Sequence, residues 1–115
     1  MRSIATAALC VIGLSLSPRV EALTVGEFVT VCEQAGRPCA DIPVLQAYVG
    51  GALDFVAVLH EQTDYVRPIY CRSPDELFDL PAIIAFIEDN RAGNANSNAM
   101  TLVVRFLEEF GQCPP

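Results

Sequence analysis

Apolar residues recur at intervals of three and four along most of this chain, the spacing typical of helices that pack on one another. The longest such segment, Val44 to Leu59, is apolar on most sides and contains a single carboxylate, Asp54. A helix that is apolar all round normally lies in the middle of its protein. We therefore predict that this segment forms the central helix, with the other helices packed around it.

Capping signals predict where the first two helices begin and end. Thr24 to Glu27 is a capping box, in which a hydroxyl and a carboxylate satisfy free amides of the first turn reciprocally. Gly36 and Pro38 mark the loop that ends this first helix. Asp41 is expected to cap the central helix, with Pro43 in its first turn.

The third helix is predicted in two pieces. Ser73 to Glu76 is a second capping box with proline at the first helical position, and it predicts a short turn over 74–78. Pro81 interrupts that turn, so Asp79 is expected to restart a helix over about 80–90.

A last helix is predicted over about 97–110, where apolar residues recur at helical spacing before Gly111 stops it. Residues 61–70 show no helical period and are expected to connect the central helix to the rest, with a short extended piece near 65–69. The sequence therefore predicts an all-α fold, a small bundle of about four helices with at most one short pair of strands.

The first 22 residues have the pattern of a secretory signal peptide. Arg2 gives a positive start, Ile4 to Leu16 is an apolar run, and Val20 and Ala22 fit a cleavage site after Ala22. The mature chain would be a single domain over residues 23–115, exported to the periplasm or secreted.

Four cysteines remain in that mature chain, which implies two disulfides in an oxidising compartment. Sequence alone permits three pairings. Cys32 and Cys39 bracket a short loop between the first two helices. The last two helices should run antiparallel and so bring Cys113 back to Cys71. We therefore expect the pairs 32–39 and 71–113.

The mature chain is strongly acidic. Only Glu21 of the 14 acidic residues lies in the leader, so 13 remain against five arginines and no lysine. This balance argues against nucleic acid and anionic membranes as partners and would suit a basic protein. The central apolar segment also looks too short to span a bilayer.

Little in the sequence points to catalysis. Asp54 could serve as a buried general acid or base, but a structural role at a polar edge of the helix is favoured. His60 and Glu61 open a zinc-protease-like run that has Asp64 where a second histidine is needed, so we expect no metal site. The cysteines lack zinc-site spacing, and no cofactor motif is present, which favours a binding protein over an enzyme.

The order of several short motifs resembles the Rap/Tai family of immunity proteins, which protect bacteria from type VI secretion amidase effectors. The motifs are Cys32, then C-x(8)-Y-V-G-G-x-x-D (Cys39, Tyr48, Gly50, Gly51, Asp54), Y-C-x-x-P (Tyr70, Cys71, Pro74), A-x-x-x-V-x-x-x-L (Ala99, Val103, Leu107) and F-G-Q-C-P (Phe110 to Pro114). The resemblance covers nearly all of the mature chain. It departs from the family pattern in the longer spacing between Cys39 and Tyr48 and in Asp79, which replaces a capping threonine.

The resemblance implies a small all-helical periplasmic protein, often a homodimer, that binds a peptidoglycan-cleaving amidase and blocks its active-site cleft. Tyr48, Gly50, Gly51 and Asp54 would then belong to the scaffold. Residues that contact the partner are expected in exposed loops held by a rigid frame. The candidates are Tyr65, Arg67, Asn94, Asn96 and Ser97.

An acid-activated periplasmic chaperone is the competing class. Such a protein would lose charge on acidification, loosen and expose apolar surface to its clients. Capture of clients only in acid would favour it, whereas retention of a cell-wall amidase at neutral pH would favour immunity.

Overall fold

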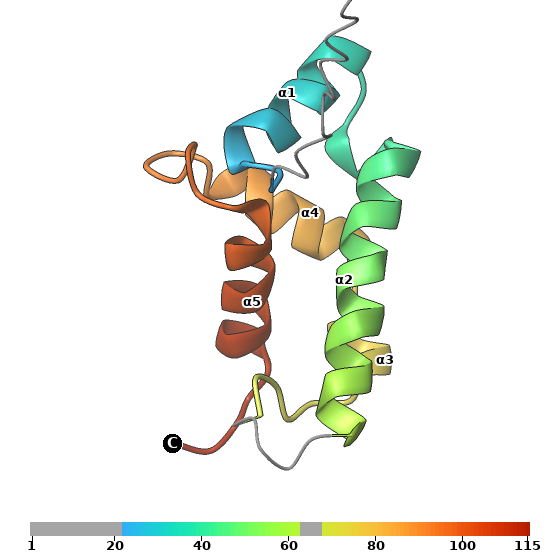
Figure 1. Cartoon of the computed structure of the whole chain (residues 1–115), viewed down its shortest axis with the longest axis vertical. Helices are drawn as coiled ribbons and strands as arrows, with labels where there is room; N and C mark the ends of the chain where they lie inside the picture. Colours follow the sequence, from blue (N-terminus) through green and yellow to red (C-terminus); the bar gives the residue numbers. More distant parts are fainter. Residues whose placement is uncertain (1–21, 63–67) are drawn as a thin grey trace, which may run out of the picture.

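The computed structural model describes residues 22–62 and 68–115, and this part of the chain is all-α (Figure 1). Its helices are α1 (Val25–Ala35), the 3-10 helix η1 (Cys39–Asp41), α2 (Pro43–Gln62), α3 (Pro74–Leu77), α4 (Leu80–Asp89) and α5 (Ala99–Phe110). The one β bridge among the described residues joins Thr24 to Asn98. The all-α prediction is confirmed, while most of the extended piece expected near 65–69 lies outside the described residues.

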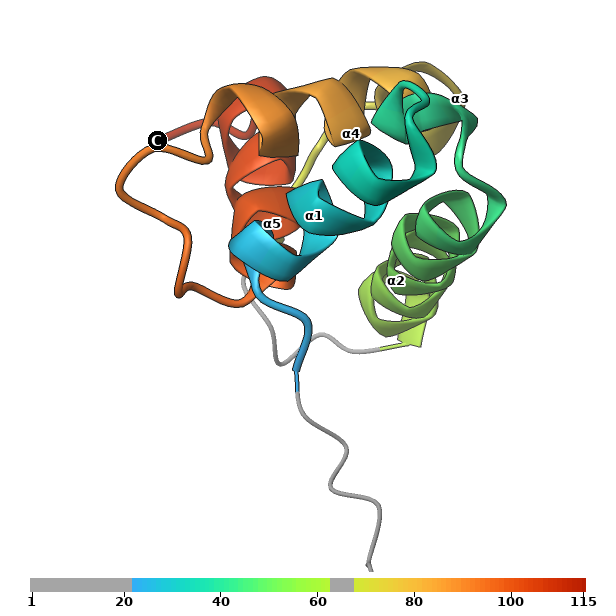
Figure 2. The ribbon, with the colours of Figure 1, turned by 90° about the horizontal axis from the view of Figure 1, so that it is seen from above.

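The central helix of the bundle is α4. Its residues Ile83, Ile84 and Ile87 are fully buried, and α4 contacts α1, η1, α2 and α5. Seen from above, α4 runs along the upper edge of the view, with α1 beside it, α5 at the left and α2 at the lower right (Figure 2). The core of the protein therefore gathers around α4.

The prediction that the Val44–Leu59 segment would be central is wrong. In the structure α2 lies along one side of the molecule (Figures 1 and 2), and only Leu45, Val49 and Leu53 are buried in it. The physical reason is length. A 20-residue helix is about 30 Å long, whereas the ten residues of α4 span about 15 Å. The short helices around α4 cannot cover α2 on all sides.

The two glycines of α2 do not admit a neighbouring helix. Apart from the backbone of α2 itself, a Cβ atom added to Gly50 or Gly51 would meet no atom of the described residues within 4 Å. No other helix in this part of the chain therefore packs closely against either glycine.

Both ends of α1 follow the sequence signals. The Thr24 N–H donates to Glu27 Oε2 (2.8 Å) and the Glu27 N–H donates to Thr24 Oγ1 (3.2 Å), so the predicted capping box is confirmed. Gly36, at a φ of 62°, takes the left-handed conformation that ends the helix. The disulfide between Cys32 and Cys39 then ties α1 to η1.

The caps of the later helices were predicted in part. Pro43 is the first residue of α2, but Asp41 lies in η1 and does not cap α2 as expected. Asp79 caps α4 by accepting from the Ala82 N–H (3.2 Å), as predicted.

The second capping box is wrong, because Ser73 makes no side-chain hydrogen bond to the first turn of α3. Glu76 instead pairs with Arg72, at 3.3 Å between Arg72 Nη2 and Glu76 Oε2. The Glu76 carboxylate is thus paired with the Arg72 guanidinium and does not complete a capping box at the start of α3.

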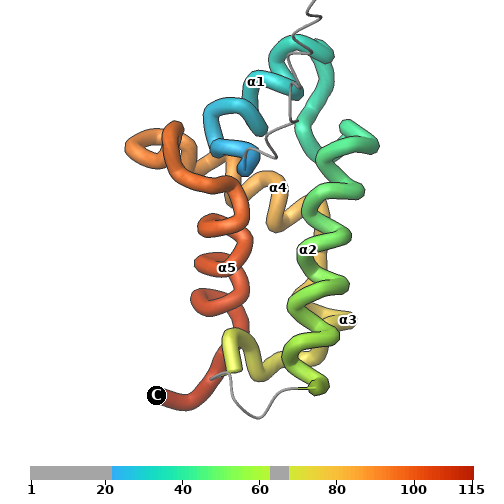
Figure 3. The backbone as a smooth tube through the Cα atoms, viewed as in Figure 1, coloured from blue at the N-terminus to red at the C-terminus, as the bar shows by residue number. Residues whose placement is uncertain are grey.

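Gly111 joins the C-terminal segment to the segment before α3. Its carbonyl accepts hydrogen bonds from the Cys71 N–H (2.8 Å) and the Arg72 N–H (2.9 Å), beside the predicted disulfide between Cys71 and Cys113. The helix α5 ends there as expected, but Gly111 has a right-handed backbone. Glycine is needed because an added Cβ would lie 2.8 Å from the Cα of Tyr70. Figure 3 shows this segment before α3 beside the end of the chain.

Alanine substitutions should distinguish Gly51, which has free space around it, from Gly111, which lies against the backbone of Tyr70. Gly51→Ala should stabilise the protein by about 0.5–1 kcal/mol, because alanine favours helix and the site has room. Gly111→Ala should destabilise it by about 1–3 kcal/mol, because the backbone of Tyr70 must move. Urea unfolding followed by circular dichroism measures both changes. Equal effects of the two substitutions would contradict this account.

Loss of either disulfide should lower stability, and the loss should be larger for the bridge that closes the longer loop. The separations are 42 residues for Cys71–Cys113 and 7 residues for Cys32–Cys39. Chain entropy then gives about 4 and about 2.5 kcal/mol respectively. Paired serine variants, compared by urea unfolding without reductant, test the order, and a larger loss for the 32–39 pair would refute it.

Candidate functional site

The loop between α4 and α5 is held against the start of α1. The Val25 N–H donates to the Ser97 carbonyl (2.9 Å) and the Gly26 N–H donates to the Ala95 carbonyl (3.0 Å). The loop thus satisfies amides that the first turn of a helix leaves free. This anchoring fixes the shape of residues 90–98 at one end of the molecule (Figure 1).

The predicted contact residues in this loop differ in their roles. The Asn94 side chain donates to the Asn90 carbonyl (2.7 Å), so it stabilises the loop. Asn96 is exposed, while Ser97 is half-buried where its carbonyl meets α1. The other two candidates, Tyr65 and Arg67, lie outside the described residues. Of the three described candidates, only Asn96 is exposed.

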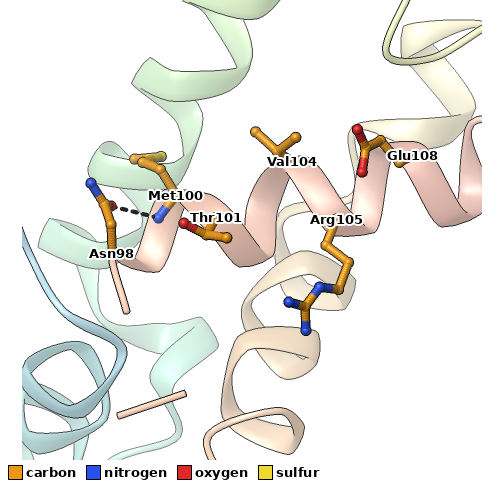
Figure 4. Close-up of a pocket in the computed structure, with 6 residues that line it drawn as sticks. All are labelled: Asn98, Met100, Thr101, Val104, Arg105 and Glu108. Carbon is orange, nitrogen blue, oxygen red and sulfur yellow. Dashed lines mark hydrogen bonds between the residues drawn. The ribbon is translucent and has the colours of Figure 1, made fainter. Parts of the chain in front are cut away.

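A shallow groove of about 460 Å³ runs along the outer side of α5, directly after this loop (Figure 4). Its rim and floor are formed by Asn98, Met100, Thr101, Val104, Arg105 and Glu108. Asn98 Oδ1 accepts from the Met100 N–H (2.9 Å) and caps the helix. Figure 4 shows Arg105 projecting away from Met100 and Val104, and Arg105 is exposed. The loop and the groove together form a continuous surface, which we term the α5 surface.

The scaffold residues named by the resemblance lie on α2. Tyr48 is half-buried, with its ring centroid 6.3 Å from that of Phe28 on α1. Asp54 is exposed on the helix surface, so apolar side chains do not enclose it. The buried environment that general acid catalysis by Asp54 would require is absent at this position.

His60 packs on an aromatic ring. Its ring centroid lies 4.4 Å from that of Tyr70, with the planes 21° apart, and Tyr70 meets Phe78 edge-on at 5.3 Å. Among the described residues, no group of three or more His, Cys, Asp or Glu side chains could hold a metal ion. In the same ranges no polar or charged residue is buried.

Sequence reasoning missed two exposed features. Arg105 was not singled out, although its spacing from Thr101 and Glu108 places all three on one side of α5. The apolar outer side of α2 was taken for core. Seven-residue spacing of Val44, Gly51 and Val58 was the available signal for it.

By length and composition alone, α2 could cross a membrane. The sequence-based view that this segment is too short was wrong, because the helix extends to 20 residues, from Pro43 to Gln62.

Comparison with known proteins gives no match: no family model, no curated protein and no solved structure is similar to this chain. The described residues define a class, a small all-α domain stapled by two disulfides. Such disulfides persist in oxidising compartments, which indicates an extracytoplasmic location.

Stability should fall in alkali because of two tyrosines. Burial raises the pKa of the Tyr48 and Tyr70 phenols above the ordinary value of 10.0, and the Glu61 carboxylate raises the pKa of Tyr70 further. The folded state thus holds these protons more tightly than the unfolded chain. Their contribution is complete below a pH of about 10 and is lost as the pH rises through the folded pKa values.

Absorbance of phenolate at 295 nm and urea unfolding between about pH 8 and 11.5 measure this effect. The loss of stability should be smaller in Tyr70→Phe and in Tyr48→Phe. If these substitutions leave both the titration and the alkaline loss of stability unchanged, the tyrosines are not responsible.

Proposed function

We propose that this chain is a periplasmic immunity protein of the Rap/Tai type, exported with a signal peptide cleaved after Ala22. It acts by binding, without catalysis of its own. Its partner is a peptidoglycan amidase effector of a type VI secretion system, whose active-site cleft it blocks.

The observation that supports this proposal best is the contact between two of the motifs on which the resemblance rests. Tyr70-Cys71 and Phe110 to Cys113 are far apart in the sequence, yet they meet through a disulfide and two hydrogen bonds to the Gly111 carbonyl. Motifs that meet in this way define a single structural unit, as the residues of a family scaffold do.

The α5 surface would meet the effector. Backbone hydrogen bonds to α1 hold its loop in one shape, which lowers the entropy lost on binding. Asn96 and Arg105 are exposed on it and offer polar and cationic groups to the rim of a cleft. The acidic charge of the whole chain would attract a basic effector.

Amidase inhibition is the direct test. The oxidised protein is titrated against purified type VI amidase effectors, and the release of peptide from peptidoglycan is followed. For its cognate effector we expect activity to vanish at one equivalent. Asn96→Arg with Arg105→Glu should weaken inhibition at least about tenfold, because both changes fall within the interface.

The matched control is Ala85→Arg, at an exposed position of α4 outside the α5 surface. It should inhibit like the unchanged protein. If no effector is inhibited, the immunity function is refuted; if inhibition survives the double substitution, the contact surface lies elsewhere.

An acid-activated chaperone is the second candidate, favoured by the exposed apolar side chains Val44, Phe55 and Val58 on α2. Protonation of carboxylates near roughly pH 2–3 would remove most of the negative charge and loosen the bundle. A denatured client kept soluble only in acid would support this function. Aggregation of the client at every pH would exclude it.

A further inference from the structure

The outer side of α2 is an exposed apolar stripe. Val44, Ala47, Gly51, Phe55 and Val58 follow one another at intervals of three and four residues and so share one side of the helix. The exposed fractions are 63% for Val44, 64% for Phe55 and 48% for Val58. Together they form a continuous row along most of the 20-residue helix, which we term the α2 stripe.

The α2 stripe contributes no buried residue to the core of the described part of the chain. Leu45, Val49 and Leu53, on another side of the helix, provide the buried contacts of α2 with the core. At Gly51, in the middle of the stripe, a Cβ would meet no atom within 4 Å. Large apolar side chains left in water in a continuous row are typical of interaction surfaces.

Within α2, the formally charged side chains are all carboxylates. The sequence of α2 contains no lysine or arginine, and His60 near its end stacks on Tyr70. Asp54 and Glu61 are exposed and seven residues apart, so they line the same edge of the stripe. A ligand that buries the stripe therefore meets carboxylates along its border.

We propose that the α2 stripe binds a basic amphipathic helix of a partner protein. The apolar side of that helix would pack on Phe55, Val58 and Val44, with its closest approach at Gly51. Lysine or arginine side chains beside its apolar row would reach Asp54 and Glu61. This is packing of one helix on another, with charge complementarity along the edge of the contact.

Charge also weighs against the other occupants of an apolar face. A second copy of this chain carries the same net charge of −7 and would place its own Asp54 and Glu61 against the shared interface. A bilayer of anionic lipid would be repelled in the same way. The stripe is separate from the α5 surface, so this inference does not rest on amidase binding.

The test uses a synthetic 18-residue helix with leucine on one side and lysine on the other, and a matched peptide with glutamate in place of lysine. Fluorescence anisotropy of each labelled peptide gives its Kd for the oxidised protein. The lysine peptide should bind at least about tenfold more tightly than the glutamate peptide. Asp54→Asn with Glu61→Gln should reduce this preference and its dependence on salt.

The deciding variant is Phe55→Ser, which leaves the charge unchanged and should weaken binding of the lysine peptide about tenfold. Ala85→Ser, at an exposed position of α4, is the matched control and should bind like the unchanged protein. Circular dichroism verifies the fold, and Val58→Ser replaces Phe55→Ser if that variant unfolds.

Three results would overturn the proposal. The first is binding of the lysine peptide that Phe55→Ser and Val58→Ser leave unchanged, or no binding at all. The second is a dimer in sedimentation equilibrium that Phe55→Ser dissociates, which would assign the stripe to a second copy. The third is cosedimentation with vesicles of phosphatidylcholine and phosphatidylglycerol that the same substitution abolishes.

Discussion

The burial of α4 is the interaction on which the rest of this structure depends. Ile83, Ile84 and Ile87 are fully removed from water because α1, η1, α2 and α5 all pack on one short helix. A chain of this size buries only about 60–65% of the surface that its unfolded form exposes. The core is accordingly thin, and the two disulfides join segments that meet at its ends. Among the neighbours of α4, α1, η1 and α5 are held in place by a cap or a disulfide as well as by packing.

Those local devices were the part that could be predicted from the sequence. The capping box at Thr24, the cap at Asp79 and both disulfide pairs depend on residues close in sequence or on one helical hairpin. The second capping box failed for an equally local reason, since Arg72 one turn away competes for Glu76. A pattern of residue types does not report which of two partners a carboxylate will choose.

The order of helices in space could not be predicted, because it depends on long-range packing. The segments that form α2 and α4 are both apolar, and α4 is the more hydrophobic of the two per residue. Length also matters: the neighbouring helices cover the buried side of the short α4 along its whole length, whereas the long α2 extends past them. The candidate site shows the same limit of sequence-based prediction. Composition identified the polar residues of the loop. Only the structure shows that the Asn94 side chain bonds within its own loop.

The exposed apolar side of α2 is a consequence of long-range packing, which places α4 and not α2 at the core. Since α4 and the disulfides supply the stability, the outer residues of α2 are not needed for the core. Gly51 makes the point most clearly: it costs helix stability relative to alanine and gives no packing within the chain in return. Stability of this fold would be served by alanine at this position and by polar residues in place of Phe55 and Val58. Folding alone thus does not account for the composition of this surface. The proposed interaction with a partner helix would account for it, because burial of these side chains becomes favourable only once a complementary surface covers them.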